Sequence, residues 1–147
     1  MFIDANIFLE LALEDKRSDE CEKLFLEIKR KNLPSFTSDF IFYTCLIQIE
    51  NKLKPTQNME DFMIFIDNIE SLDIVSPRTE TVYDTFKIMR THNLDFDDSL
   101  VVAMMKSLNI IQLVSFDKHF DKIKEIKRIE PQNILDLLQK EKGKDGK

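Results

Sequence analysis

Short apolar runs that alternate with longer amphipathic segments are the feature that most constrains the fold of this 147-residue chain. Five runs fit strands: residues 2–3, 33–36, 72–75, 110–116 and 126–129. Between the runs, apolar residues recur at helical spacing, as at Cys21, Leu24 and Ile28. Strands separated by helices imply crossover connections and a mainly parallel sheet covered on both faces. We therefore expect an α/β fold in three layers, α/β/α, with a short central sheet of four or five strands.

The expected helices are placed by their apolar spacing and by capping residues. They cover residues 5–13, 18–31, 38–53, 58–71, 77–91, 97–108, a short turn after 117, and a closing helix from 131. Ser18 is the expected N-cap of the second of these, and Pro77 and Pro131 suit first helical turns. No repeat or linker interrupts the pattern, so we expect a single domain over residues 1–141 and a disordered tail over 142–147.

Composition excludes several classes of function. Both glycines, Gly143 and Gly146, lie near the end of the chain, so the body has no glycine-rich phosphate loop. The net charge of -6 argues against a DNA-binding protein that works by bulk electrostatics. Cys21 and Cys45 lie inside helical segments and are expected to be buried thiols. Without an apolar run of membrane-spanning length or a basic-then-apolar leader, we expect a cytoplasmic protein with no membrane partner.

Three aspartates stand where an open α/β sheet carries its site. Asp4 directly follows the first strand, Asp117 directly follows the run at 110–116, and Asp98 opens the helix before that run. In such sheets the site lies outside the carboxyl ends of the strands, where the strand order reverses. Each aspartate alone is explained by a turn or a helix cap. Together they form a crowded acidic set, which a bound cation would neutralise.

The ligand type indicates which cation this would be. A site of carboxylate oxygens favours Mg²⁺ or Mn²⁺ rather than zinc, and such ions promote phosphodiester hydrolysis. The chain has two histidines, His92 and His119, and neither belongs to a Ser-His-Asp arrangement. Because His119 follows Lys118 near Asp117, we assign both to contacts with the phosphates of a substrate.

The same residues carry a resemblance to a known family. The opening FIDANIFLELAL is similar to the first motif of PIN-domain ribonucleases, in which a strand ends in Asp, one residue and Asn. The stretch LDFDDSLVVAMMKSLNIIQLVSFDKHFDKI resembles the third and fourth acidic motifs of that family. The resemblance implies catalytic and metal-binding roles for Asp4, Asp98 and Asp117, supported by Asn6 and Ser115. It also implies a metal-dependent endoribonuclease, similar to the VapC toxins of toxin–antitoxin pairs, that acts as a homodimer beside an antitoxin.

One position departs from the family pattern. The family places a glutamate in the helix after the second strand, and the corresponding position here is Thr44. Glu50 lies about 600° further along the helix and should face solvent. Thr44 can hydrogen-bond a metal-bound water but supplies no charge. Asp121, one turn beyond Asp117 on the same face, is a candidate substitute for the missing acid; the alternative is a solvated helix residue.

Three other interpretations compete with an active nuclease. A catalytically degenerate PIN-like module that binds RNA or a protein partner is motivated by Thr44 and by the acidic net charge. A phosphatase of the haloacid-dehalogenase type would need a second aspartate where Asn6 stands, because that residue acts as the general acid. A receiver domain would need a lysine at the end of a strand, which this chain lacks.

Overall fold

The computed structural model describes residues 1–145, with side chains described up to residue 141, and they form three layers around one parallel sheet. The strands are β1 (Phe2–Ile3), β2 (Ser35–Ser38), β3 (Leu72–Val75), β4 (Gln112–Val114) and β5 (Lys127–Ile129). Their order is β3-β2-β1-β4-β5, and each neighbouring pair runs parallel. The expected α/β/α architecture is confirmed. The order reverses between β1 and β4, which places the crevice at their carboxyl ends.

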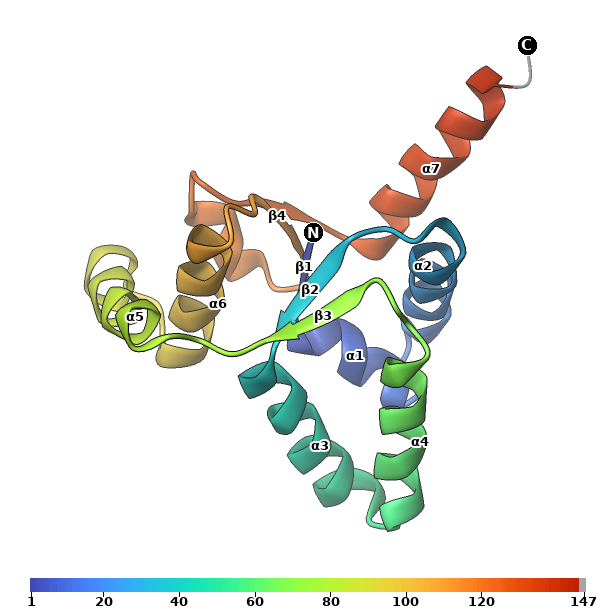
Figure 1. Cartoon of the computed structure of the whole chain (residues 1–147), viewed down its shortest axis with the longest axis horizontal. Helices are drawn as coiled ribbons and strands as arrows, with labels where there is room; N and C mark the ends of the chain where they lie inside the picture. The colour runs from blue at the N-terminus through green and yellow to red at the C-terminus, as the bar shows by residue number, and fades with distance from the viewer. Residues whose placement is uncertain (146–147) are drawn as a thin grey trace.

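The helices cover both faces of the sheet. Four of them lead from β1 through β2 to β3: α1 (Ala5–Ala12), α2 (Ser18–Lys31), α3 (Asp39–Leu53) and α4 (Thr56–Asp67). The chain returns from β3 to β4 through α5 (Thr79–His92) and α6 (Phe96–Ser107). Right-handed crossovers then require the two groups to lie on opposite faces. Figure 1 shows α5 and α6 to the left of the strands and α1, α2 and α4 to the right.

Two further elements complete the described chain. The short 3₁₀ helix η1 (Lys118–Lys122) connects β4 to β5, and α7 (Pro131–Asp145) packs against α2. Helix α7 reaches into the segment 142–147 that the sequence predicted to be a disordered tail, and residues 146–147 lie outside the described residues. Within residues 1–145, no helix is both long enough and apolar enough to span a membrane.

The core fixes the two strands and the helix that carry the acidic residues. Phe2 and Ile3 of β1 and Leu113 and Val114 of β4 are completely buried. Helix α6 is buried over the run from Ser99 to Met105, so it is nearly enclosed by the rest of the molecule. Burial of this much apolar surface fixes the position of α6, and with it that of Asp98 directly before the buried run.

Asparagine ends several helices and explains where predicted boundaries were wrong. Asn32, Asn93 and Asn109 have φ of 52°, 51° and 55°, the left-handed conformation that glycine usually supplies at helix ends. The N–H groups that follow turn back to the helices: Leu33 N donates to the Ile28 carbonyl at 3.0 Å. The predicted strands at 33–36 and 110–116 therefore start later, at residues 35 and 112.

Helix starts also differ from the predictions by one to two residues. Ser18 is the first residue of α2 rather than its N-cap, and Pro77 precedes α5 by two positions. Helix α6 starts at Phe96, one residue before the predicted start, and its N-cap is Asp95, whose carboxylate accepts a hydrogen bond from Asp98 N at 3.0 Å. Cys21 and Cys45 are free and buried, as predicted.

Candidate metal-binding site

Asp4 lies at the carboxyl end of β1, where it is 8% exposed. Its Oδ1 accepts a hydrogen bond from Ala5 N at 2.7 Å, so Asp4 is the N-cap of α1. Its Oδ2 accepts hydrogen bonds from Ser115 Oγ at 2.6 Å and from Asn6 Nδ2 at 3.0 Å. The pairing of Ile3 with Val114 between β1 and β4 brings Asp4 and Ser115 side by side. Asp4 is thus buried, and each of its carboxylate oxygens accepts at least one hydrogen bond.

Ser115 and Asn6 connect Asp4 to the backbone that carries Asp117. Asn6 Nδ2 donates to Ser115 Oγ at 3.0 Å, and Phe116 N donates to Asn6 Oδ1 at 3.2 Å. Asp117 N donates to the same Ser115 Oγ at 3.0 Å. The Asp-x-Asn and Ser-x-Asp motifs, about 110 residues apart in the chain, therefore form one hydrogen-bonded unit. This arrangement supports the positioning role expected for Asn6 and Ser115.

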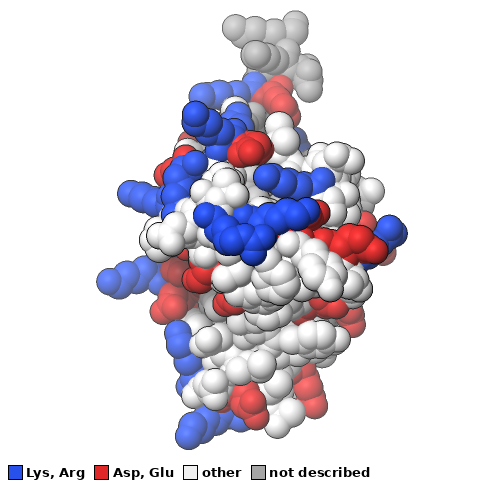
Figure 2. Space-filling model, turned by 90° about the vertical axis from the view of Figure 1, so that its left-hand side faces the viewer, with Lys and Arg blue, Asp and Glu red and all other residues white. Residues whose placement is uncertain are grey.

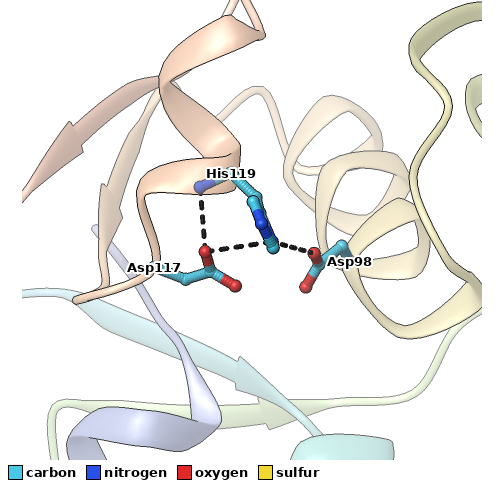
Figure 3. Close-up of side chains that lie close together, drawn as sticks. All are labelled: Asp98, Asp117 and His119. Atoms are coloured by element: carbon cyan, nitrogen blue, oxygen red, sulfur yellow. Dashed lines mark hydrogen bonds and ion pairs between the residues drawn. The ribbon is translucent and has the colours of Figure 1, made fainter.

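Asp98, Asp117 and His119 face one another beside this unit (Figure 3). Asp117 is the N-cap of η1, and its Oδ1 accepts a hydrogen bond from His119 N at 2.8 Å. His119 Nδ1 lies 3.3 Å from Asp117 Oδ1 and 4.0 Å from Asp98 Oδ2. One ligand atom from each of the three residues lies within 4.8 Å of the others. These residues fit a single divalent cation, with Asp4 directly behind them.

The raised pKa values of two carboxylates at the site also favour a bound cation. Burial above all, and then the charges of Asp95, Asp117 and Asp4, together raise the pKa of Asp98 to about 6, against a lowering by His119. Burial also raises the pKa of Asp4, and Asp117 adds to that rise, while the hydrogen bond from Ser115 opposes it. The ionised carboxylates are therefore disfavoured here in the absence of positive charge, which a cation would supply.

Thr44 shares a small cavity with two of the aspartates. The cavity has a volume of about 50 Å³, and its lining includes Asp4, Asp97, Asp98 and Thr44. The family position that Thr44 occupies therefore faces the acidic site, whereas Glu50 is exposed, as expected. Asp97 is exposed where it borders this cavity. The site has room beside Thr44 for a water molecule.

Asp121 lies next to a cation of the protein itself, which the sequence did not predict. Arg128 Nε donates to Asp121 Oδ1 at 2.6 Å and Arg128 Nη2 donates to Oδ2 at 3.2 Å, and this pairing lowers the pKa of Asp121. Asp121 is also outside the group of possible metal ligands among the described residues. The structure therefore does not place it as a substitute for the missing glutamate. Lys118 is exposed at the start of η1.

Arg128 is the site residue that sequence reasoning missed. It is 12% exposed in its side chain, and its Nη1 donates to the Ser115 carbonyl at 2.9 Å and to Glu130 Oε1 at 3.1 Å. Together with its pairing to Asp121, these bonds tie η1 to the ends of β4 and β5. The sequence offers one weak indication of this role: alternation along β5 places the Arg128 side chain on the opposite face of the sheet from those of its two neighbours.

Comparison with known proteins identifies the family of this fold and site. A sequence model of the PIN domain matches residues 1–126, and the chain belongs to the PIN-domain family. A search of curated protein sequences finds no match.

Solved structures with the same fold include VapC proteins. VapC20 of Mycobacterium tuberculosis, described as a sarcin-ricin loop cleaving toxin, has a TM-score of 0.69 at 15% identity, covering 84% of this chain and 94% of that one. VapBC2 of Rickettsia felis, bound to a promoter DNA fragment, gives 0.69 at 16% identity, with 88% and 96% coverage. A toxin–antitoxin complex from Klebsiella pneumoniae gives 0.63 at 14% identity, with 88% and 96% coverage. At these identities the likeness shows a shared fold.

Proposed function

We propose that this protein is a divalent-metal-dependent endoribonuclease that hydrolyses RNA phosphodiester bonds. The observation that supports it best is the meeting of Asp98 and Asp117 at the carboxyl ends of the central strands, with buried Asp4 behind them. A divalent ion held there supplies positive charge to a phosphodiester and lowers the pKa of a water molecule. Asp4, Asp98 and Asp117 hold the ion, Asn6 and Ser115 position them, and Thr44 faces the same cavity.

The segment beside the site is basic, although the chain as a whole is acidic. Residues 118–128 contain five basic residues and two acidic ones, although the whole chain carries -6. The exposed lysines in this segment are Lys118, Lys122, Lys124 and Lys127. Figure 2 shows Lys and Arg side chains gathered over the upper part of the face that carries α5 and α6. Such a local basic surface attracts RNA phosphates, and we assign Lys118 to that contact.

The toxin–antitoxin context is a further part of the proposal. The fold shared with VapC20, a toxin, and with a toxin–antitoxin complex supports a toxin that binds an antitoxin. We further propose that it forms a homodimer in the cytoplasm, as the motif resemblance implies. Light scattering on the purified protein should then give twice the 17.4 kDa mass of one chain. Induced expression should arrest bacterial growth, and the Asp98→Asn variant should not.

A second candidate is a catalytically degenerate PIN module that binds RNA or a protein partner. Thr44 is the observation that favours it, because the cavity it shares with Asp4 and Asp98 lacks the fourth carboxylate of the family pattern. Fewer carboxylates weaken the binding of a second ion more than that of a first. This candidate predicts partner binding that survives Asp4→Asn.

An RNA cleavage assay separates the two candidates. Purified protein is incubated with a panel of structured and unstructured RNAs in Mg²⁺, in Mn²⁺ and in EDTA. We expect the wild-type protein to cleave RNA in Mg²⁺ or Mn²⁺ and not in EDTA. Asp98→Asn should lower the cleavage rate by at least about a hundredfold. Asp19→Asn should change the rate little, because Asp19 is a matched exposed aspartate in the first turn of α2. Absence of metal-dependent cleavage across the panel would favour the binding module, and full activity in Asp98→Asn would refute the site assignment.

A further inference from the structure

His119 is placed at the acidic site in a way that the sequence did not predict. Its imidazole lies between the carboxylates of Asp117 and Asp98 (Figure 3), with Nδ1 facing an oxygen of each. Building on the proposed function, we infer that His119 is a nitrogen ligand of the bound ion and makes the site select a transition-metal ion such as Mn²⁺ or Co²⁺ over Mg²⁺.

The spacing of the donor atoms suits a shared ion. Ligand atoms about 2.1 Å from one ion are separated by about 3 Å when adjacent and about 4.2 Å when opposite. His119 Nδ1 lies 3.3 Å from Asp117 Oδ1 and 4.0 Å from Asp98 Oδ2, so both separations fall within that interval. The three donors come from two elements that the core and the η1 hydrogen bonds hold in place, α6 and the turn after β4.

Of the acidic groups at the site, Asp98 is the one with the most unused capacity to bind an ion. Asp4 already accepts three hydrogen bonds, from Ala5 N, Asn6 Nδ2 and Ser115 Oγ. The Asp98 carboxylate, by contrast, is 19% exposed, and its described interactions are repulsion by other aspartates and the contact with His119. An ion placed between Asp98, Asp117 and His119 would therefore satisfy the acidic group with the fewest partners.

The chemistry of the ligand atoms determines which ion binds most tightly. Mg²⁺ strongly prefers oxygen ligands and retains much of its water, whereas imidazole binds Mn²⁺, Co²⁺ and later transition metals increasingly well. A mixed oxygen–nitrogen set therefore shifts selectivity away from Mg²⁺. This refines the expectation of an all-oxygen site that is indifferent between Mg²⁺ and Mn²⁺, and it gives His119 a role other than a contact with RNA phosphate.

Spectroscopy of the metal-loaded full chain tests the inference without reference to cleavage. Pulsed electron paramagnetic resonance of bound Mn²⁺ detects coupling to a directly coordinated ¹⁴N nucleus. We expect that coupling in the wild type and in His92→Asn, and its loss in His119→Asn. His92, at the end of α5, is the only other histidine and lines a different cavity, so its variant is a matched control. His119 is 75% exposed, so its replacement should leave the fold intact, which circular dichroism verifies.

Calorimetric titrations give the selectivity. His119→Asn should lower Mn²⁺ and Co²⁺ affinity by about tenfold or more and change Mg²⁺ affinity much less. Wild-type Mn²⁺ binding without ¹⁴N coupling, an absence of Mn²⁺ binding, or an equal loss of affinity for all three ions would each overturn the inference. RNA cleavage with no ¹⁴N coupling would leave the proposed function standing, and ¹⁴N coupling with no cleavage would leave the ligand assignment standing.

Discussion

Asp98→Asn should stabilise the metal-free protein at neutral pH, although it removes a residue of the proposed site. Burial and neighbouring carboxylates raise the pKa of Asp98 from its usual 3.8 to about 6. A rise of that size costs the folded state at most about 3 kcal/mol at pH 7.5. Because Asp98 is only half-buried, solvent screening reduces this cost to about 2–3 kcal/mol. Asparagine has nearly the same shape without the charge, but it loses about 0.3–1 kcal/mol of interaction with the N-terminus of α6. We expect a net stabilisation of about 2 kcal/mol.

The sign of the pH dependence follows from the direction of the shift. Because the folded-state pKa is raised, the penalty is present above about pH 6 and disappears below the unfolded-state value near 4. The stability advantage of Asp98→Asn should therefore shrink as the pH falls from 7.5 to 4. Thermal unfolding in EDTA should show a melting temperature about 4–8 °C higher for the variant at pH 7.5.

Bound metal should make the wild type more stable than Asp98→Asn, the reverse of their order in EDTA. At a Mn²⁺ concentration of 100 times Kd, binding stabilises the wild type by about 2.7 kcal/mol, and the variant should gain little. Asp19→Asn reports the loss of a helix-terminal charge by itself, since Asp19 is exposed in the first turn of α2. If Asp98→Asn is no more stable than Asp19→Asn in EDTA at pH 7.5, the electrostatic reasoning is refuted.

Three further predictions concern neighbouring residues. Ser115→Ala removes a buried hydroxyl with three hydrogen-bond partners, so urea denaturation should show a free energy of unfolding lower by about 2–3 kcal/mol. In the control Ser107→Ala, the hydroxyl has one described partner, and the loss should be less than about 1 kcal/mol. Equal losses in the two variants would contradict the proposed network. Thr44→Glu adds a carboxylate beside the cavity and should raise Mn²⁺ affinity about tenfold in calorimetry; an unchanged affinity would place Thr44 outside the site. Burial raises the pKa of the Cys21 and Cys45 thiols to about 12, so Ellman's reagent should modify neither in the folded protein and both in urea.

The sequence by itself determined the architecture and the position of the acidic site along the chain. Apolar periodicity separates strands from helices locally, and helices between strands require crossovers, so a parallel sheet in three layers followed without knowledge of strand order. Asp4 and Asp117 were found for a related reason: residues that directly follow parallel strands gather at one edge of a sheet. These features depend on local chain direction and on near neighbours, which a sequence displays directly.

Tertiary structure decided what depends on packing between distant segments. The sequence left open which strands neighbour β1, and with it the hydrogen bonds that join Asp4 to Ser115. It also assigned Asp121 to the acidic site, whereas the return of β5 beside β4 brings Arg128 to Asp121. The position of His119 between two carboxylates depends on the 3₁₀ geometry of η1 and on the docking of α6. A side chain finds its partners only when the backbone elements that carry them have packed, so these contacts have no local signature.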